Sequence, residues 1–465
     1  MGMRERKTAK DSGRKFIAQE SCRLDGRLGR SGCCAFAGEV AACLLWFGAA
    51  RANGYRALGE PECQTSAEPM SQANAPAAEI RRDILALADA CVLCGQCLPV
   101  CPTYALDQRE AESPRGRIVI VQHLARASHG ELGADLPALD HCLSCGRCEA
   151  ICPAKVEFSR LMDLSRQLRF PGRSSSLAVR GILAVVTRPT LLGWLIRLTA
   201  WPVQWLPGRW MRIARALRAP LTVFTPSLVS DSRPAVILFA GCVERYAEQT
   251  ALIALRRILE RLGWQVVEMP SQGCCGALAR HAGDAAVAAR MAQTNQRALA
   301  AALASHTVQP RYILTLSTGC HSDVANTLGQ RLPVLEAMEF LLSHTRLREW
   351  QFRSVAAEVV LHSPCTSRST VENGLWAAEE ILRLLPGLRV QLMPRQGCCG
   401  AAGAHMLAFP QRAALLAASV LDQFASFPEA RRCTSNVGCH LHLQTLSDPS
   451  TPRLQHPLVL IDEAM

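Results

Sequence analysis

Two short runs of cysteine have the residue type and the spacing needed to hold inorganic clusters. Both follow the pattern C-x-x-C-x-x-C-x-x-x-C-P, and their members are Cys91, Cys94, Cys97, Cys101, Cys142, Cys145, Cys148 and Cys152. The closely spaced triplet places three thiolates on one turning loop. Such a loop can bind three irons of a cubane [4Fe-4S] cluster and leaves the fourth iron to a distant cysteine. The proline after each fourth cysteine directs the chain away, because it cannot continue a helix or donate a backbone hydrogen bond.

The same run is typical of bacterial two-cluster ferredoxins, in which the fourth cysteine of each run binds the cluster of the other run. On this pattern the first cluster is held by Cys91, Cys94, Cys97 and Cys152. The second cluster is held by Cys142, Cys145, Cys148 and Cys101. Zinc sites and disulfides are the alternatives, but zinc sites usually pair two C-x-x-C units without a third cysteine at the same step. The runs therefore predict two [4Fe-4S] clusters and an electron-transfer function.

A second set of cysteines occurs twice in matched order. Each copy has a cysteine at the end of an expected strand, a Cys-Cys-Gly after the next strand, and a Gly-Cys after a third. The members are Cys242, Cys274, Cys275 and Cys320 in the first copy and Cys365, Cys398, Cys399 and Cys439 in the second. Because the carboxyl ends of strands in an open α/β sheet gather at one crevice, each four can converge as possible ligands of a further metal or iron–sulfur centre. Structural burial of small thiols is the alternative.

Four histidines follow these cysteines at matched positions. His281 and His405 each lie six residues after the second cysteine of their Cys-Cys-Gly, and His321 and His440 each follow the last cysteine of their copy. The symmetry favours a role for some of them, whereas a hydrogen-bonded or exposed imidazole is the commoner case. Cys433 has no equivalent in the first copy, and we interpret it as incidental.

The elements that must position these residues indicate an α+β multidomain protein. Helices expected at 79–90, 115–127 and 156–169 carry the two runs in a helical, ferredoxin-like domain, and Ser113-Pro114 is typical of a helix start. Two tandem α/β repeats follow. Their expected strands are 235–240, 264–269, 312–316, 358–362 and 389–393, and their expected helices are 245–262, 284–305, 375–385 and 411–424. The predicted boundaries are 1–78, 79–170, 171–232, 233–350 and 351–465.

Two of these segments lie outside the expected domains. Residues 1–69 hold five unpatterned cysteines and an apolar stretch, 41–50, that is too short to span a bilayer. We expect this segment to be a disordered leader or an over-extended reading frame, with Met70 as the true start. A signal peptide is the alternative. The segment 171–232 is rich in arginine and tryptophan and is interrupted by prolines. Either it forms a basic amphipathic surface that touches a membrane or a partner subunit, or its helices pack on the domain core.

The composition of the chain limits the kinds of partner that it can bind. The 465 residues carry a net charge of +12, which suits an acidic partner or an anionic membrane surface. No basic motif is interleaved with aromatic residues, so we expect no nucleic-acid binding. No Gly-x-Gly-x-x-Gly follows an expected strand, so we expect neither FAD nor NAD on this chain. Thiolate-bound clusters need a reducing compartment, which predicts a cytoplasmic protein, with a peripheral position at the inner face of the cell membrane as an option.

The order of these parts resembles the iron–sulfur subunit of glycolate oxidase (glycolate dehydrogenase), a member of the CCG-domain (cysteine-rich) oxidoreductases. The resemblance covers about residues 79–465. It is carried by the tandem runs, by the paired Cys-Cys-Gly repeats, and by P-T-Y at 102–104, S-P-R-G-R-I at 113–118, S-T-G-C at 317–320 and N-V-G-C at 436–439. It implies an electron-transfer subunit without catalytic residues of its own, which passes electrons from a separate FAD-binding subunit that oxidises glycolate or a similar 2-hydroxy acid toward quinone.

Related families offer alternatives. These are the iron–sulfur subunits of lactate utilisation and of anaerobic glycerol-3-phosphate dehydrogenase, and a catalytic subunit like that of heterodisulfide reductase. The last holds a non-cubane cluster with five cysteines, one of which is replaced here by Ser317 or Asn436. This departure disfavours disulfide reduction on this chain. A redox sensor is a further alternative, although no DNA-binding element is evident.

Overall fold

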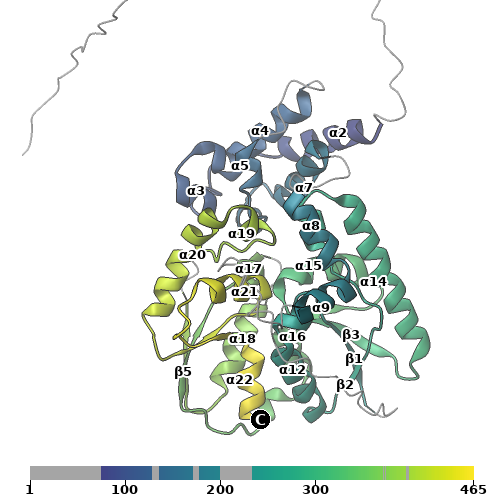
Figure 1. Cartoon of the computed structure of the whole chain (residues 1–465), viewed down its shortest axis with the longest axis vertical. Helices are drawn as coiled ribbons and strands as arrows, with labels where there is room; N and C mark the ends of the chain where they lie inside the picture. Colours follow the sequence, from purple (N-terminus) through teal and green to yellow (C-terminus); the bar gives the residue numbers. More distant parts are fainter. Residues whose placement is uncertain are drawn as a thin grey trace, which may run out of the picture. The chain divides into compact units, whose positions relative to one another are not determined.

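A computed structural model describes residues 75–127, 136–170, 177–198, 233–369, 371, 373–393 and 397–465 (Figure 1). The expected leader up to residue 74, the proposed start at Met70 and the tryptophan-rich stretch from residue 199 to 232 lie outside the described residues. None of the described helices combines the length and the apolar character needed to cross a bilayer.

Three helices build the part of the chain that carries the two runs. They are α2 (Ala75–Asp89), α4 (Pro114–Arg126) and α7 (Phe158–Arg169), and their apolar faces meet in a core that includes Ile84 and Leu161. The expected start of α4 is confirmed, since the Ser113 hydroxyl accepts a hydrogen bond from the Gly116 amide at 2.9 Å. Short elements complete this part: α3 (Pro102–Asp107), η2 (Glu110–Glu112), α5 (Pro137–Asp140) and α6 (Arg147–Ala150).

The described part of the arginine- and tryptophan-rich segment forms two helices, α8 (Leu177–Val186) and α9 (Pro189–Leu198). Val179 and Leu183 of α8 are buried and pack with Ala279 of the first repeat. Trp194 of α9, in contrast, is 64% exposed. Helix α8 thus packs on the protein, whereas contact of this segment with a membrane or a partner subunit stays a prediction.

Each α/β repeat forms a four-stranded parallel sheet. The first has strand order β2-β1-β3-β4 and the second β6-β5-β7-β8. The strands are β1 (Ala235–Phe239), β2 (Gln265–Val267), β3 (Pro310–Thr315), β4 (Val334–Glu336), β5 (Ala357–Leu361), β6 (Leu388–Leu392), β7 (Arg431–Cys433) and β8 (Leu454–Gln455). Strands β4, β7 and β8 were not predicted from the sequence, because two or three residues are too few to show an alternating pattern.

Helices flank both sheets. In the first repeat they are α11 (Glu244–Ala247), α12 (Gln249–Arg261), α13 (Ala277–His281), α14 (Ala285–Ser305), α15 (Thr318–Leu328), α16 (Ala337–His344) and η3 (Leu347–Glu349). In the second they are α17 (Thr366–Ser369), α18 (Gly374–Arg383), α19 (His405–Ala408), α20 (Pro410–Ala425), α21 (Val437–Leu446) and α22 (Pro457–Ala464). The single helix expected at 245–262 is wrong. Glu248 leaves the helical conformation (φ −121°, ψ 30°) and separates α11 from α12.

The two repeats share one apolar core. Buried side chains of β1, α12 and α16 from the first repeat pack in the same cluster as those of β5, α18 and α22 from the second. Helix α22 lies beside α12 (Figure 1), and Asp462 accepts hydrogen bonds from Arg257 and Arg261 across the contact. Because burial of apolar surface is the main source of stability, the repeats stabilise each other.

Glu336 is a fully buried carboxyl group at the start of α16. One carboxyl oxygen accepts hydrogen bonds from the Met338 and Glu339 amides at 2.9 and 3.1 Å, and burial raises the pKa of the group to about 8. A carboxyl whose pKa is raised on folding stabilises the protein below its unfolded pKa, and this contribution is lost as the pH rises through the folded pKa. Glu336 is therefore expected to make the protein less stable between about pH 4.5 and 8.

The variant Glu336→Gln tests this expectation, because glutamine keeps an oxygen for both amides and never ionises. Its free energy of unfolding is expected to exceed that of the wild type increasingly with pH, by at most about 1.4 kcal/mol per pH unit. Urea denaturation at about pH 6 and about pH 9 measures the difference. Equal pH dependence in the two proteins would show that Glu336 does not titrate in this range.

Candidate iron–sulfur and cysteine sites

The four cysteines predicted for the first cluster line one cavity. Cys91, Cys94 and Cys97 reach it from the loop after α2, and Cys152 reaches it from the end of the second run. Cys148 also lines this cavity. The fold thus brings the distant Cys152 to the first triplet, as crossed binding requires.

The other four lie around a second cavity. Cys142, Cys145 and Cys148 line it together with Cys101, the last cysteine of the first run. Cys148 borders both cavities, so the two sites are neighbours. Every described cysteine is a free thiol. In the described part of the chain no three His, Cys, Asp or Glu side chains surround a position for a single metal ion.

The backbone of the two triplet loops has the same unusual conformation. Leu93 and Ser144, at equivalent positions, have φ values of 55° and 47°, and the glycines two residues later, Gly95 and Gly146, have φ values of 81° and 69°. Residues other than glycine rarely adopt positive φ, so the loops maintain a strained turn twice in register. Successive turns of this kind direct backbone N–H groups inward, where they can hydrogen-bond an anionic cluster. The loop shape and the donor set therefore both fit a cluster bound by thiolates.

A buried cluster of charged side chains around Glu112 contacts Cys101. The Glu112 carboxylate is 2.7 Å from Arg117, 2.6 Å from His141 and 3.1 Å from Arg412. The Glu112 backbone carbonyl accepts hydrogen bonds from the Cys101 thiol and from Thr103. The Arg117 guanidinium in turn donates to the Cys101 sulfur at 3.8 Å. This cluster of charges, which the residues alone do not predict, joins η2, α4, the residue that follows α5, and α20, and its Arg117 lines the second cavity.

The four cysteines of the first repeat meet at the carboxyl end of its sheet, as expected. The sulfurs of Cys242 and Cys274 are 3.4 Å apart, and Cys275 interacts with both Cys274 and Cys320. Mutual hydrogen bonding and burial raise the pKa of Cys242 and Cys275, whereas the same hydrogen bonds lower that of Cys274. A metal centre here would have to displace the protons of buried thiols, since thiolates are the binding form.

The second repeat assembles its four cysteines in the same way and also contacts the second run. The sulfurs of Cys399 and Cys439 are 2.9 Å apart. Burial and the neighbouring Cys398 raise the pKa of Cys365 to about 12. Burial raises the pKa of the Cys145 thiol, and the neighbouring Cys365 and Cys398 raise it further.

Two hydrogen bonds fix this contact between the second run and the second repeat. The Ser369 hydroxyl donates to the Cys145 carbonyl at 2.9 Å, and Arg147 donates to the Gly397 carbonyl at 3.4 Å. The equivalent contact of the first repeat is different. It is made by α7, whose Asp163 pairs with Arg280 of α13. Among the described residues, only the cysteines of the second repeat therefore adjoin a cysteine run.

Ser317 and Asn436, which replace the first cysteine of a C-x-x-C, have structural roles. Asn436 caps α21 by accepting from the Gly438 and Cys439 amides at 2.9 and 3.2 Å. Its amide group donates across the repeat interface to Thr318 and, within its own repeat, to Thr366. The Ser317 hydroxyl accepts from the Val437 amide of the other repeat at 3.3 Å. These two polar residues thus join the repeats at the position where a fifth ligand would stand.

We expect Asn436→Ala to destabilise the protein by about 1–3 kcal/mol, because it removes a helix cap and leaves buried interface groups without partners. Denaturant unfolding measures the loss. Asn373→Ala is the matched control, since Asn373 also precedes a helix but makes no side-chain cap. A loss in Asn436→Ala no larger than in this control would contradict the structural role.

The matched histidines separate into two kinds. His321 hydrogen-bonds Thr315, and His440 lies 2.5 Å from Glu248 of the other repeat, which raises the pKa of the imidazole against the effect of burial. These partners are protein groups. His281 and His405 instead both line a third cavity, whose lining includes none of the eight cysteines of the repeats.

Comparison with known protein families agrees with this architecture. Residues 87–156 match the 4Fe-4S dicluster domain, and residues 236–325 and 359–444 match the cysteine-rich domain. The chain is therefore an iron–sulfur protein in which a dicluster domain precedes two cysteine-rich repeats, and it has an electron-transfer role. The predicted α+β fold class is confirmed.

Among individual proteins, the chain is similar to the glycolate oxidase iron–sulfur subunits, as its motifs predicted. It is 27% identical to that of Escherichia coli K12 over 394 residues, which cover 81% of this chain and 94% of the relative. The probable glycolate oxidase iron–sulfur subunit of Bacillus subtilis 168 is 24% identical, covering 76% of this chain and 88% of the relative. A component of the dihydromethanophenazine:CoB–CoM heterodisulfide reductase of Methanosarcina acetivorans is 25% identical, covering 71% of this chain and 82% of the relative.

Proposed function

We propose that this chain is the iron–sulfur electron-transfer subunit of an FAD-linked dehydrogenase that oxidises glycolate or a related 2-hydroxy acid and delivers the electrons to quinone. The observation that carries the proposal is the pair of neighbouring cysteine cavities that share Cys148. The resemblance to glycolate oxidase iron–sulfur subunits supports the substrate class. Bound [4Fe-4S] clusters would supply one-electron chemistry, and the eight cysteines of the two runs are the proposed ligands.

The two cavities differ in their exposure, which suggests where the flavin subunit docks. Val92 and Leu93, beside Cys94 in the first loop, are 69% and 54% exposed, and Cys94 itself is exposed. The second loop is covered by the second repeat through Ser369. Because the rate of electron transfer falls steeply with distance, a partner subunit has to approach the exposed loop closely. Val92 and Leu93 supply apolar surface for such a contact.

The protein side chains have two tasks in this proposal. They hold the loops in one conformation, and they balance the negative charge of thiolates. Arg117, which is almost completely buried and donates to the Cys101 sulfur, performs the second task at the inner cavity. Hydrogen bonds and positive charge near cluster sulfurs are among the factors that set a reduction potential.

A catalytic role like that of heterodisulfide reductase is the competing proposal, and the similarity to a component of that enzyme favours it. The position of Cys145 beside Cys365 and Cys398 would place a redox centre next to a cysteine-rich site. The serine and asparagine at positions 317 and 436 weigh against it, because both are engaged in capping and in the repeat interface.

Anaerobic purification from the native cell tests the proposal. We expect a flavin-containing subunit to co-purify and the complex to reduce a dye with glycolate or lactate. Iron and acid-labile sulfide should each approach about eight per chain from the two runs. Glycerol 3-phosphate serves as the rival substrate. A stable, flavin-free monomer that reduces disulfides would contradict the proposal and support the competing one.

A further inference from the structure

The cavities of the two cluster sites differ in the charged side chains that line them. Arg117 and Arg147 line the cavity of the second site, and no Asp or Glu is among its described lining residues. Arg115 is the one charged residue that lines the cavity of the first site in the described part of the chain. Its side chain is 32% exposed and is paired with Glu110, so water and the carboxylate both weaken its field at the cysteines. Positive charge is therefore concentrated at the second site.

Arg117 contacts one of the proposed ligands of the second site directly. Its guanidinium donates to the Cys101 sulfur at 3.8 Å and to the Ala138 carbonyl at 2.7 Å, and it is paired with Glu112. The side chain is only 1% exposed. These contacts fix the guanidinium beside the sulfur, and a charge from which water is excluded acts more strongly on its neighbours than an exposed one.

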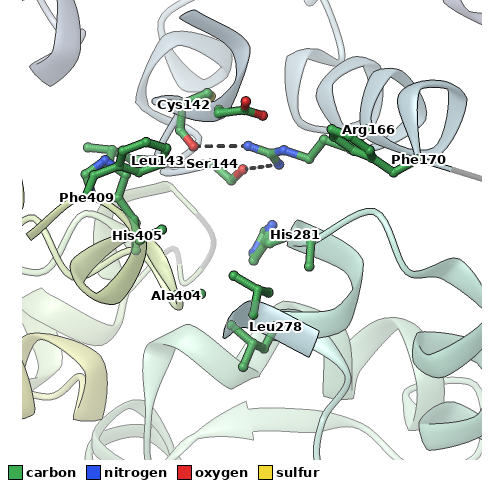
Figure 2. A pocket seen from close by; sticks show the side chains of 15 residues that line it. Cys142, Leu143, Ser144, Arg166, Phe170, Leu278, His281, Ala404, His405 and Phe409 are labelled. Atoms are coloured by element: carbon green, nitrogen blue, oxygen red, sulfur yellow. Dashed lines mark hydrogen bonds between the residues drawn. The ribbon is translucent and has the colours of Figure 1, made fainter. Parts of the chain in front are cut away.

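Another arginine holds the loop of the second run in place. Figure 2 shows Arg166 of α7 beside this loop, where it donates to the Ser144 hydroxyl at 2.7 Å and to the Cys142 carbonyl at 3.0 Å. Arg166 does not line the second cavity, and the Asp163 carboxylate lies 3.6 Å from it. We therefore interpret Arg166 as a residue that fixes the loop, in contrast to the two arginines whose side chains border the cluster site.

Burial and positive charge have opposite effects on a site that accepts an electron. An added electron makes a thiolate-bound cluster more negative, which burial disfavours and a nearby guanidinium favours. The second site is covered by the second repeat through Ser369, whereas Cys94 at the first site is exposed. Burial alone would therefore make the inner site the poorer acceptor and would keep an electron at the exposed site. Positive charge at the inner site opposes this effect.

We propose that Arg117 and Arg147 raise the reduction potential of the second cluster and so allow electrons to pass from the exposed site to the inner one. The proposal rests on the proposed function and gives its electron transfer a direction. In each step the first cluster loses one electron and the second gains it, and no bond is formed or broken. The electron then lies beside the cysteines of the second repeat, because Cys145 adjoins Cys365 and Cys398.

A redox titration of the anaerobically loaded full-length protein, followed by electron paramagnetic resonance, tests the proposal. The signal that is missing in Cys145→Ser identifies the second cluster. Arg117→Gln should lower the midpoint potential of this signal by about 59 mV, which corresponds to an equilibrium constant about tenfold smaller for a one-electron reduction. Arg147→Gln should shift it less in the same direction, because Arg147 is only half-buried. Arg117→Lys keeps the positive charge and should reduce the shift.

The folding of these variants can be checked on the same samples by their iron content. Arg117→Gln is expected to fold, because Glu112 keeps His141 and Arg412 as partners. Arg169→Gln is the matched control. Arg169 is equally buried and is paired with Asp140 at 2.8 Å, but it lines neither cluster cavity. Its replacement should leave both midpoint potentials unchanged.

The proposal is overturned if the second signal has the same midpoint potential in the wild type and in both glutamine variants of the lining arginines. It is also overturned if Arg169→Gln shifts this signal as much, or if Arg117→Gln shifts only the signal that Cys94→Ser removes. Dye reduction by the complex with glycolate or lactate tests the proposed function separately. Dye reduction with unshifted potentials keeps the dehydrogenase and rejects the role of the arginines. Shifted potentials without dye reduction have the opposite meaning.

Discussion

The variant Cys145→Ser is expected to lose one cluster completely and with it the reduction of external acceptors by the complex. Serine is a poor substitute, because its hydroxyl stays protonated near neutral pH and its oxygen is a hard ligand for an iron–sulfur cluster. Iron content should fall by about four atoms per chain. Flavin reduction in the partner subunit should survive, since the proposed substrate site is not on this chain.

The same assay distinguishes crossed from uncrossed binding of the two clusters. If Cys101 serves the second cluster, Cys101→Ser and Cys145→Ser should remove the same signal in the electron paramagnetic resonance spectrum of the reduced protein. Cys152→Ser should then remove the signal that Cys94→Ser removes. The opposite pairing would show that each run binds its own cluster.

Cys433→Ser is the matched control for these variants. Cys433 lies in β7, fully buried in the core that the repeats share, and burial raises the pKa of its thiol to about 12. Its replacement should leave the iron content and both signals unchanged. Full iron content in Cys145→Ser as well would mean that the ligand assignment is wrong.

The variant Glu112→Gln is expected to cause the largest loss of stability, about 3–5 kcal/mol in the free energy of unfolding. The carboxylate side chain is only 8% exposed and neutralises Arg117, whose side chain is only 1% exposed. Removing the Glu112 carboxylate leaves the buried Arg117 charge with the Cys101 sulfur as its remaining charge-balancing contact, and breaking a buried ion pair is strongly destabilising. Arg412 keeps Asp107 as a partner, whereas no such second carboxylate is seen beside Arg117 among the described residues.

Glu110→Gln provides a control two residues away. Glu110 is paired with Arg115 at 2.6 Å, but both side chains are exposed to solvent to a large extent. Exposed ion pairs contribute little, so this variant should unfold almost as the wild type does. Chemical denaturation of the cluster-loaded protein compares the two. Equal stability of both variants would contradict the proposed importance of the buried charge cluster.

The inner cluster site of the chain is more firmly embedded in the protein than the outer one. The outer loop around Cys94 is exposed and offers apolar side chains to a partner. The inner loop contacts the charge cluster at Glu112, the cysteines of the second repeat and the cavity with His405. Loss of Cys145 therefore affects the junction of all three parts.

The sequence by itself determined those features that depend on local spacing. The cysteine runs, the duplication of the Cys-Cys-Gly repeat and the Ser113 cap are patterns over a few residues, and the chain forms them where they were expected. Most individual helices and the longer strands can also be predicted, because consecutive residues carry their periodic pattern. The interruption at Glu248 was missed, since nothing in the residues around it breaks a helical pattern.

Only the tertiary structure decided which of these local features meet. Cys145 lies beside Cys365 and Cys398 because the second run packs on the second repeat and not on the first. His281 and His405 come from repeats that are separated in the chain, yet they line one cavity with Ser144. Such contacts depend on how whole domains bury their apolar surfaces against each other, and this packing leaves no periodic signal in the sequence.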